Sequence, residues 1–264
     1  MTRFVYIADT HWGADPMGYQ QQQGYPDKLP DILSALSEWL AVRGDIDFLL
    51  HGGDMIDFTS DDTITAAANA FDLGIPVYLC LGNHDVTTRD AVERWLTRAL
   101  PFFPNGTPDY TIASDDCVLH VTPNQWCDDP YYWDSAQQPH LSPAQMTRLT
   151  RALSTRTDVP HLLLTHSPVY GLPAAQTGFT EAYHAPPAAF TAQICHLAAR
   201  HGTLKGVLGA HNHMTMHVHQ AGVDFVTVSA LVETPFEFNL FEVTPRGIAM
   251  STFRLSGALT FKGD

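Results

Sequence analysis

The chain has 264 residues, of which 45% are hydrophobic and 16% are charged, so it can bury a substantial core and lacks the composition of a disordered protein. Its formal net charge is −14, from 28 acidic and 14 basic side chains, which disfavours binding to nucleic acid polymers and to anionic membranes. No apolar run reaches the roughly 18 residues that predict a membrane span.

The N-terminal segment and the cysteines favour an intracellular protein. The segment MTRFVYIAD is typical of a buried strand rather than of a secretory signal. The cysteines are widely spaced and form no C-x-x-C pair; they are Cys80, Cys117, Cys127 and Cys195. Free thiols in a reducing compartment are the simplest interpretation, so we expect a cytoplasmic location. The oligomeric state stays open.

The first part of the chain alternates predicted strands with predicted helices. The strands are expected at residues 3–9, 46–50 and 75–81. The helices are expected from Leu29 to just before Gly44, from about Asp62 to Leu73, and from Asp90 to Leu100. The first of these has leucine and isoleucine at helical spacing, with Pro30 in its first turn. Such alternation is typical of an α/β fold.

From Tyr110 onward, shorter strands predominate and two long loops intervene. The expected strands are residues 111–114, 117–121, 161–166, 204–210, 214–220, 223–230, 236–243 and 248–255. A capping box of Ser142 and Gln145 predicts a helix that ends near Ser154, and another helix is expected from about Ala188 to His201. With this number of elements, we expect one domain, residues 1–264, in which two sheets are flanked by helices.

Polar residues cluster at five predicted strand ends. The clusters are residues 9–11, 52–57, 82–85, 165–167 and 209–213. In α/β sheets, ligands bind beyond the carboxyl ends of strands, so we expect the clusters to converge. Asp9 and His11 are two residues apart, as are His211 and His213, and an extended backbone would place both members of each pair on one face.

The residue types in these clusters indicate metal binding. Asp, Asn and His without Cys suit Zn²⁺, Mn²⁺ or iron and argue against a thiolate-rich structural zinc site. Seven such groups exceed the needs of one tetrahedral ion, whereas two ions that share a carboxylate would use them all. Any one of these residues alone would more simply be a turn, a cap or a packed histidine. The ordered combination carries the prediction.

The pattern D-x-H, G-D-x-x-D, G-N-H-D, a single His and G-x-H-x-H resembles the calcineurin-like metallophosphoesterase superfamily. The resemblance spans Asp9 to His213, and the last block departs from the usual G-H-x-H because Ala210 stands between Gly209 and His211. It implies an α/β fold of four layers, with a two-sheet β sandwich between helices (αββα). It also implies two divalent or trivalent transition metal ions (Mn, Fe or Zn) as cofactors.

The resemblance further implies a role for each matching residue. The ligands of one metal would be Asp9, His11 and His213. Those of the other would be Asn83, His166 and His211, and Asp54 would bridge the two. His84 resembles the histidine that contacts the phosphate and protonates the leaving group, and Asp85 would hold its imidazole in orientation. Asp57 is interpreted as structural.

The implied reaction is hydrolysis of a phosphoester by a metal-bridging hydroxide. Purple acid phosphatases have Tyr where Asp57 stands, and Ser/Thr protein phosphatases resemble G-D-x-x-D-R-G with G-N-H-E, which Phe58, Thr59 and Asp85 break. Exonucleases of the SbcD type share D-x-H-x-G and G-G-D but are longer, and the acidic balance disfavours a long polyanion. The compact cyclic-nucleotide and glycerophosphodiester phosphodiesterase group remains. A small phosphodiester substrate is therefore the leading interpretation, with a phosphomonoester as the alternative, followed by an SbcD-like nuclease or a non-catalytic scaffold.

Three loops, residues 12–27, 123–140 and 167–186, are expected to form the rim of the pocket. They carry aromatic residues that could stack on a substrate ring or could simply pack beneath the loops, namely Trp12, Tyr19, Trp126, Tyr131, Tyr132 and Trp133. His140 and His184 could reach the site from these loops. His217 and His219 are interpreted as ordinary strand residues.

Overall fold

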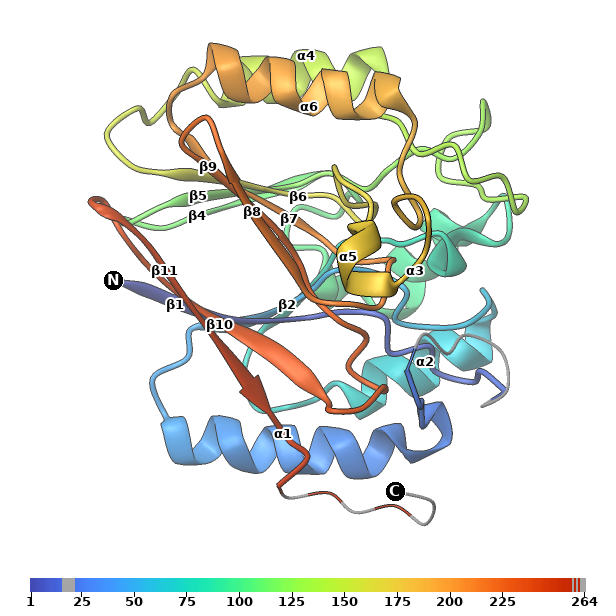
Figure 1. Ribbon diagram of the computed structural model, residues 1–264. Coiled ribbons are helices and arrows are strands. Elements are labelled where there is room, and N and C mark those ends of the chain that lie inside the picture. Colours follow the sequence, from blue (N-terminus) through green and yellow to red (C-terminus); the bar gives the residue numbers. More distant parts are fainter. Residues whose placement is uncertain (16–21, 258, 260, 262–264) are drawn as a thin grey trace.

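Two β-sheets stacked face to face form the centre of the molecule, and helices cover their outer faces (Figure 1). The computed structural model describes residues 1–15, 22–257, 259 and 261. Tyr19, one of the candidate rim residues, lies outside this described part. The α/β fold with two mixed sheets flanked by helices confirms the predicted fold class.

The first sheet has the strand order β11-β10-β1-β2-β3. Its strands are β1 (Thr2–Ile7), β2 (Phe48–His51), β3 (Val77–Leu79), β10 (Glu237–Thr244) and β11 (Gly247–Arg254). β1, β2 and β3 are parallel, whereas β10 pairs antiparallel with β1 and β11 antiparallel with β10. The helix α1 (Leu29–Arg43) covers the outer face of this sheet (Figure 1). It ends at Gly44, as predicted.

The second sheet has the order β4-β5-β6-β7-β9-β8. Its strands are β4 (Tyr110–Ala113), β5 (Val118–Val121), β6 (His161–Leu164), β7 (Leu204–Gly209), β8 (Met216–Gln220) and β9 (Val223–Thr227). β5, β6, β7 and β9 run parallel. The helices α4 (Pro143–Ala152) and α6 (Ala188–Arg200) cover its outer face (Figure 1). The capping box of Ser142 and Gln145 at the start of α4 is confirmed.

Two hydrophobic cores hold these layers together. The larger core fills the space between the sheets, where it includes Phe4 and Leu50 of the first sheet and Leu162 of the second, and it continues under α1. The smaller core lies under α4 and α6 and includes Leu163, Leu149 and Phe190. Successive residues of β6 therefore enter different cores, which explains why this strand is apolar throughout.

Shorter helices surround the carboxyl ends of the parallel strands. They are α2 (Asp61–Ala70), α3 (Ala91–Arg98), α5 (Ala174–Thr177), and the 3-10 turns η1 (Pro26–Lys28), η2 (His84–Val86) and η3 (Leu100–Phe102). α5 lies in a segment that was predicted to be only loop. Within the described residues, no helix is long and apolar enough to cross a membrane. The loops that follow β1, β2, β3, β6 and β7 meet on one side, where the predicted site residues lie.

Candidate metal centre

The loops that carry the candidate ligands have an unusual backbone. The φ angles are positive at Asp9 (52°), His11 (43°), Asp54 (53°), His211 (66°) and His213 (58°). L-residues rarely adopt this left-handed conformation unless the surroundings impose it. Here the backbone N–H of Asp9 donates to Gly53 O at 2.9 Å. The prediction that extended backbone places each histidine pair on one face is therefore wrong, because these residues follow the strands in left-handed turns.

Two glycines allow the loops to approach one another closely. A Cβ atom at Gly53, where φ is 109°, would lie 2.5 Å from His166 Nδ1. A Cβ atom at Gly82 would collide with the carboxylate of Asp54. Both positions need glycine so that the loops after β2 and β3 can close around Asp54.

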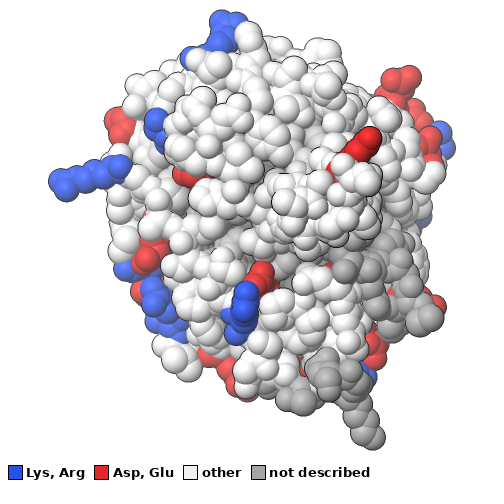
Figure 2. Space-filling view, in the orientation of Figure 1, with Lys and Arg blue, Asp and Glu red and all other residues white. Residues whose placement is uncertain are grey.

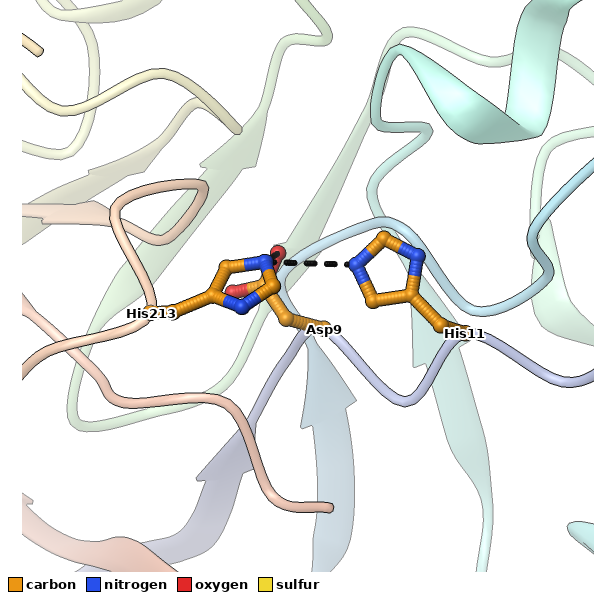
Figure 3. A group of neighbouring side chains, drawn as sticks. All are labelled: Asp9, His11 and His213. Carbon is orange, nitrogen blue, oxygen red and sulfur yellow. Dashed lines mark hydrogen bonds and ion pairs between the residues drawn. The ribbon is translucent and has the colours of Figure 1, made fainter. Parts of the chain in front are cut away.

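Asp9, His11 and His213 form the first candidate ligand set, called here the Asp9 group (Figure 3). Their ligand atoms lie within 4.8 Å of one another. The Nε2 atoms of His11 and His213 are 3.3 Å apart, and His213 Nε2 lies 3.8 Å from an oxygen of Asp9. Segments about two hundred residues apart in the sequence thus bring three metal-binding atoms together.

The partners behind these two rings fix where their protons lie. His213 Nδ1 is 2.7 Å from Glu233 Oε1, and His11 Nδ1 is 3.4 Å from Asp57 Oδ1. Because a carboxylate can only accept, His213 Nδ1 carries the proton; the contact of His11 Nδ1 with Asp57 is electrostatic rather than a hydrogen bond, and it favours the same arrangement, with a lone pair on Nε2 of each neutral ring. Two lone pairs then face each other at 3.3 Å, so that a cation or an additional proton must lie between them. A metal ion fits this requirement.

Asp54, His166 and His211 form the second candidate set, called here the Asp54 group. His166 Nδ1 donates to Gly52 O at 2.9 Å, so its Nε2 is the atom that a metal would use, and this Nε2 lies 3.2 Å from Asp54 Oδ2. His211 Nε2 lies 3.1 Å from Gln137 Oε1, so its Nδ1 can act as the ligand atom. Beside them, the buried Oδ1 of Asn83 has no hydrogen-bond partner in the described part of the chain.

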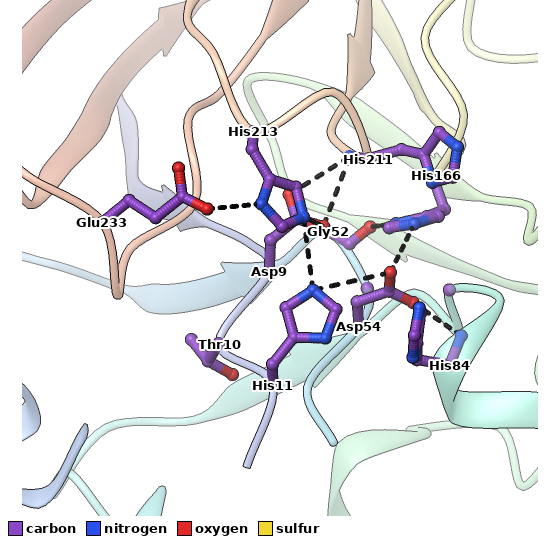
Figure 4. Close-up of polar contacts among 12 residues, drawn as sticks. Asp9, Thr10, His11, Gly52, Asp54, His84, His166, His211, His213 and Glu233 are labelled. Atoms are coloured by element: carbon purple, nitrogen blue, oxygen red, sulfur yellow. Dashed lines mark hydrogen bonds and ion pairs between the residues drawn. The ribbon is translucent and has the colours of Figure 1, made fainter. Parts of the chain in front are cut away.

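Asp54 lies between the Asp9 group and His166 of its own group (Figure 4). Its Oδ2 atom is 3.2 Å from His166 Nε2 and 3.9 Å from His11 Nε2, while its Oδ1 accepts the backbone N–H of His84 at 2.8 Å. Burial disfavours the ionised carboxylate, but the imidazoles of His166 and His84 outweigh burial and hold the pKa of Asp54 well below its usual range. The position and charge of Asp54 suit a carboxylate shared by two cations.

His84 contacts a different aspartate from the one predicted. Its Nδ1 donates to the backbone oxygen of Asp57 at 2.8 Å and lies 3.3 Å from Asp57 Oδ1. The carboxylate of Asp85 instead accepts the backbone N–H groups of Met55, Ile56 and Gly82 at 2.8–3.1 Å. The orienting contact predicted for Asp85 is therefore made by Asp57, and Asp85 holds the loops together.

The surroundings of His84 favour its charged form. Burial lowers the pKa of its imidazole, but the charge of Asp54 and the hydrogen bonds to Asp57 outweigh burial and raise the pKa to about 9. With His11 and Asp57, His84 forms a third group whose possible ligand atoms lie within 4.8 Å of one another. A protonated imidazole at this place can donate a proton to a molecule bound beside the Asp9 and Asp54 groups.

Two partners of the candidate ligands were missed in the sequence. Glu233 is only 2% exposed and supports His213, and Gln137 supports His211. Neither belongs to a spaced motif, since Glu233 follows an apolar run and Gln137 lies in a long loop. The only signal in the sequence is a single polar side chain after an apolar run for Glu233, and a position in one of the expected rim loops for Gln137.

The candidate rim aromatics have several different environments. Trp126 is 1% exposed and packs against the rings of His166 and His211, while Tyr131 bonds Asp109. Tyr132 lies under the guanidinium of Arg89, and Trp133 contacts the ring of His84. Trp12 is half-buried and forms an isolated bridge with Ile56.

Of the four remaining histidines singled out in the sequence, one lies beside a candidate metal ligand and the other three make contacts elsewhere. The ring of His184 is 5.6 Å from that of His211, so this loop does reach the site. His140 pairs its backbone with Gln125. His217 and His219 on β8 both bond Asp224, as ordinary residues of an exposed hairpin.

Comparisons with known proteins agree with this architecture. A model of the calcineurin-like phosphoesterase family matches residues 2–214. No curated protein sequence gives a significant match. The fold is similar to a dimetal phosphatase from Danio rerio, with a TM-score of 0.69 and 13% identity over 97% of this chain and 99% of that chain.

Other similar structures have different roles. One is GAP50, the anchor in the inner membrane complex of Plasmodium (TM-score 0.61, 10% identity, 100% of this chain and 86% of that chain). Another is a 5'-nucleotidase from Candida albicans (TM-score 0.57, 13% identity, 97% of this chain and 52% of that chain). At these identities the similarity shows the fold alone, so any argument about activity must come from the side chains.

Proposed function

The chain belongs to the calcineurin-like phosphoesterase family, and on that premise we propose that it hydrolyses a small phosphodiester with the help of two metal cations. The observation that carries the proposal is the convergence of histidines and carboxylates around Asp54, with the Asp9 group on one side of it and His166 and His211 on the other. A scaffold that had lost its activity would not need this arrangement.

We assign one cation to the Asp9 group and the other to the Asp54 group together with Asn83, with Asp54 shared between them. Transition metals such as manganese, iron or zinc suit these oxygen and imidazole ligands. Bound there, the cations would supply a nucleophilic water at neutral pH and stabilise negative charge on the phosphoryl oxygens. The chain's own contribution is to hold the ligands in place through Glu233, Gly52 and Gln137.

We assign the role of general acid to His84. Asp57 fixes the ring through Nδ1, so Nε2 is the atom that would deliver a proton to the departing alkoxide. Such proton transfer contributes typically about 10²–10⁴-fold to the rate. Asp57 acts through His84 as a positioning residue, and Asp85 acts on the backbone.

The charge of the site supports a diester over a monoester. The named site residues are carboxylates, amides and imidazoles, whereas Arg94, Arg98 and Arg148 pair with Asp61 and Asp109 away from the ligands. On the face shown in Figure 2, most Lys and Arg side chains gather on the left side of the view. A diester carries one negative charge less than a monoester dianion, so the two proposed cations and His84 could balance it without a further basic side chain.

The test compares bis(p-nitrophenyl) phosphate with p-nitrophenyl phosphate in the presence of Mn²⁺. We expect a higher kcat/KM for the diester. We expect His84→Ala to keep its metal content, measured by elemental analysis, while kcat for a diester with a poor leaving group falls about 10²–10⁴-fold. Preference for the monoester would favour the second candidate function, and no hydrolysis of either ester by metal-loaded protein would favour a non-catalytic role.

A further inference from the structure

Aromatic rings flank the candidate metal centre on two sides. On one side, the ring of Trp133 lies 4.8 Å from that of His84, with the two planes inclined by 43°. On the other, His184 lies 5.6 Å from His211, Tyr183 lies 4.2 Å from His184, and Phe179 lies 5.3 Å from Tyr183. Since Phe179 is 55% exposed, this second series leads from solvent to a candidate metal ligand.

Trp133 is held firmly in its position beside His84. Its backbone N–H donates to Val86 O at 2.9 Å, and Val86 closes the short 3-10 turn that begins at His84. Its indole N–H donates to Ala136 O at 3.1 Å. Because both donors of Trp133 are engaged, its remaining surface offers only apolar and stacking contact to a bound molecule.

The neighbouring aromatic residues of the same loop are used differently. Trp126 is buried, the hydroxyl of Tyr131 bonds Asp109, and the ring of Tyr132 lies 4.5 Å from the guanidinium of Arg89. Trp133 is half-buried, as Tyr131 and Tyr132 are, but unlike them it contacts the ring of the candidate acid His84. This combination distinguishes it from a residue that merely packs beneath the loop.

We propose that Trp133 is a specificity-determining residue that stacks on a planar ring in the leaving alcohol of the phosphodiester. The inference rests on the proposed function, because it is the role of His84 as the acid that places the leaving group next to Trp133. The substrate class is then narrowed to phosphodiesters whose leaving group is an aryl-bearing alcohol or a nucleoside. A purely aliphatic leaving group would gain no stacking energy from Trp133.

The experiment uses two diesters whose leaving alcohols have similar acidity and differ in ring character. They are methyl 2-phenylethyl phosphate and methyl 2-cyclohexylethyl phosphate, assayed with the Mn²⁺-loaded protein by chromatography of the released alcohol. We expect kcat/KM to be about three- to tenfold higher for the phenyl ester. This is the gain in binding that an aromatic pair typically adds to the effect of burying the ring. Trp133→Leu should abolish this preference mainly by raising KM, whereas Trp133→Phe should retain most of it.

Tyr132→Leu is the matched control, since Tyr132 is the adjacent aromatic residue but stacks on Arg89. This variant should keep the wild-type preference. Hydrolysis of both esters with the same preference in Trp133→Leu as in wild type would overturn the inference and leave the proposed function intact. Hydrolysis of bis(p-nitrophenyl) phosphate but of neither alkyl ester by wild type would overturn the inference alone. Hydrolysis of none of the three diesters would overturn the diesterase proposal, and the inference with it.

Discussion

Two pairs of buried histidines in this molecule look similar and differ in one decisive respect. His11 and His213 meet in the Asp9 group with their Nε2 atoms 3.3 Å apart. His120 of β5 and His161 of β6 meet in the second sheet, with His120 Nε2 2.9 Å from His161 Nδ1. In both pairs the rings come from separate segments of the chain, and all four histidines are buried. The difference lies in what stands behind each ring.

The pair in the sheet is a complete chain of donors and acceptors. Thr111 Oγ1 lies 3.2 Å from His120 Nδ1, and His161 Nε2 lies 3.2 Å from Arg156 O. Because the carbonyl of Arg156 accepts, His161 carries its proton on Nε2, and its Nδ1 accepts the hydrogen bond that His120 Nε2 donates. Each nitrogen has a complementary partner, so this pair has no need of a cation.

The pair in the Asp9 group has carboxylates behind it instead. The hydrogen bond to Glu233 holds the proton on the outer nitrogen of His213, and the nearby Asp57 carboxylate favours the same arrangement in His11, so that both lone pairs turn inward. A histidine pair is thus not a metal site by itself, because the acceptor behind each ring decides whether the pair bonds to itself or to an ion. The predictions below test this distinction.

The largest effect is expected at Glu233. Replacing a carboxylate behind a metal-ligating histidine typically costs 10- to 100-fold in metal affinity. We expect Glu233→Ala to weaken binding of the more tightly held Mn²⁺ by about that factor, measured by isothermal titration of chelator-treated protein. Glu237→Ala is the control, since this buried carboxylate bonds Thr215 and Arg254 rather than a candidate ligand. Equal affinities of the two variants would contradict the role given to Glu233.

The pair in the sheet should affect stability and leave metal affinity unchanged. Burial lowers the pKa of His120 to about 3, whereas a histidine in the unfolded chain titrates near about 6.5. The unfolded state therefore takes up the proton first on acidification. The contribution of His120 to the free energy of unfolding is therefore fully present above the histidine pKa of the unfolded chain. As the pH falls from there toward 3, this free energy decreases by about 1.4 kcal/mol per pH unit.

The double variant His120→Leu with His161→Leu should show a shallower loss of unfolding free energy between pH 6.5 and 4 than wild type. Urea unfolding at several pH values, with chelator in every sample, would measure the difference. Its Mn²⁺ affinity at neutral pH should match that of wild type. A variant with the wild-type pH dependence would show that the pair is not held neutral in the folded protein.

The smallest effect is expected at Gln137. Its neutral amide oxygen supports His211 at 3.1 Å near the surface, and a neutral hydrogen bond contributes about 0.5–1.5 kcal/mol. Gln137→Ala should therefore weaken the second equivalent of Mn²⁺ by about two- to tenfold, less than the loss at Glu233. Gln138→Ala, the exposed neighbour, should have no effect. A loss in Gln137→Ala as large as that in Glu233→Ala would show that the charge of the supporting acceptor does not matter.

Much of the fold followed from patterns in the sequence. Leucine spacing predicted α1 and its end at Gly44, and the capping box at Ser142 predicted the start of α4. The polar strand ends converge because parallel strands bring their carboxyl ends to one side of a sheet. These features depend on local periodicity and on simple topology, which a sequence displays directly.

What the sequence did not reveal depends on the course of the loops. The 3-10 turn at His84 directs the Asp85 carboxylate to backbone amides and leaves the His84 ring facing Asp57, so adjacency in G-N-H-D misassigned the orienting residue. Glu233 reaches His213 only because the segment between β9 and β10 folds back over the centre. The left-handed backbone at the ligands runs against residue preference and is imposed by tertiary contacts.

The carboxylate of Asp85 gathers amide hydrogens from the loop after β2, through Met55 and Ile56, and from the loop after β3, through Gly82. Asp85 therefore fixes the positions of these two loops relative to each other. Anyone who transplants the segment around Asp54 from a relative into this scaffold must carry the segment around Asp85 with it, because neither piece keeps its shape without the other.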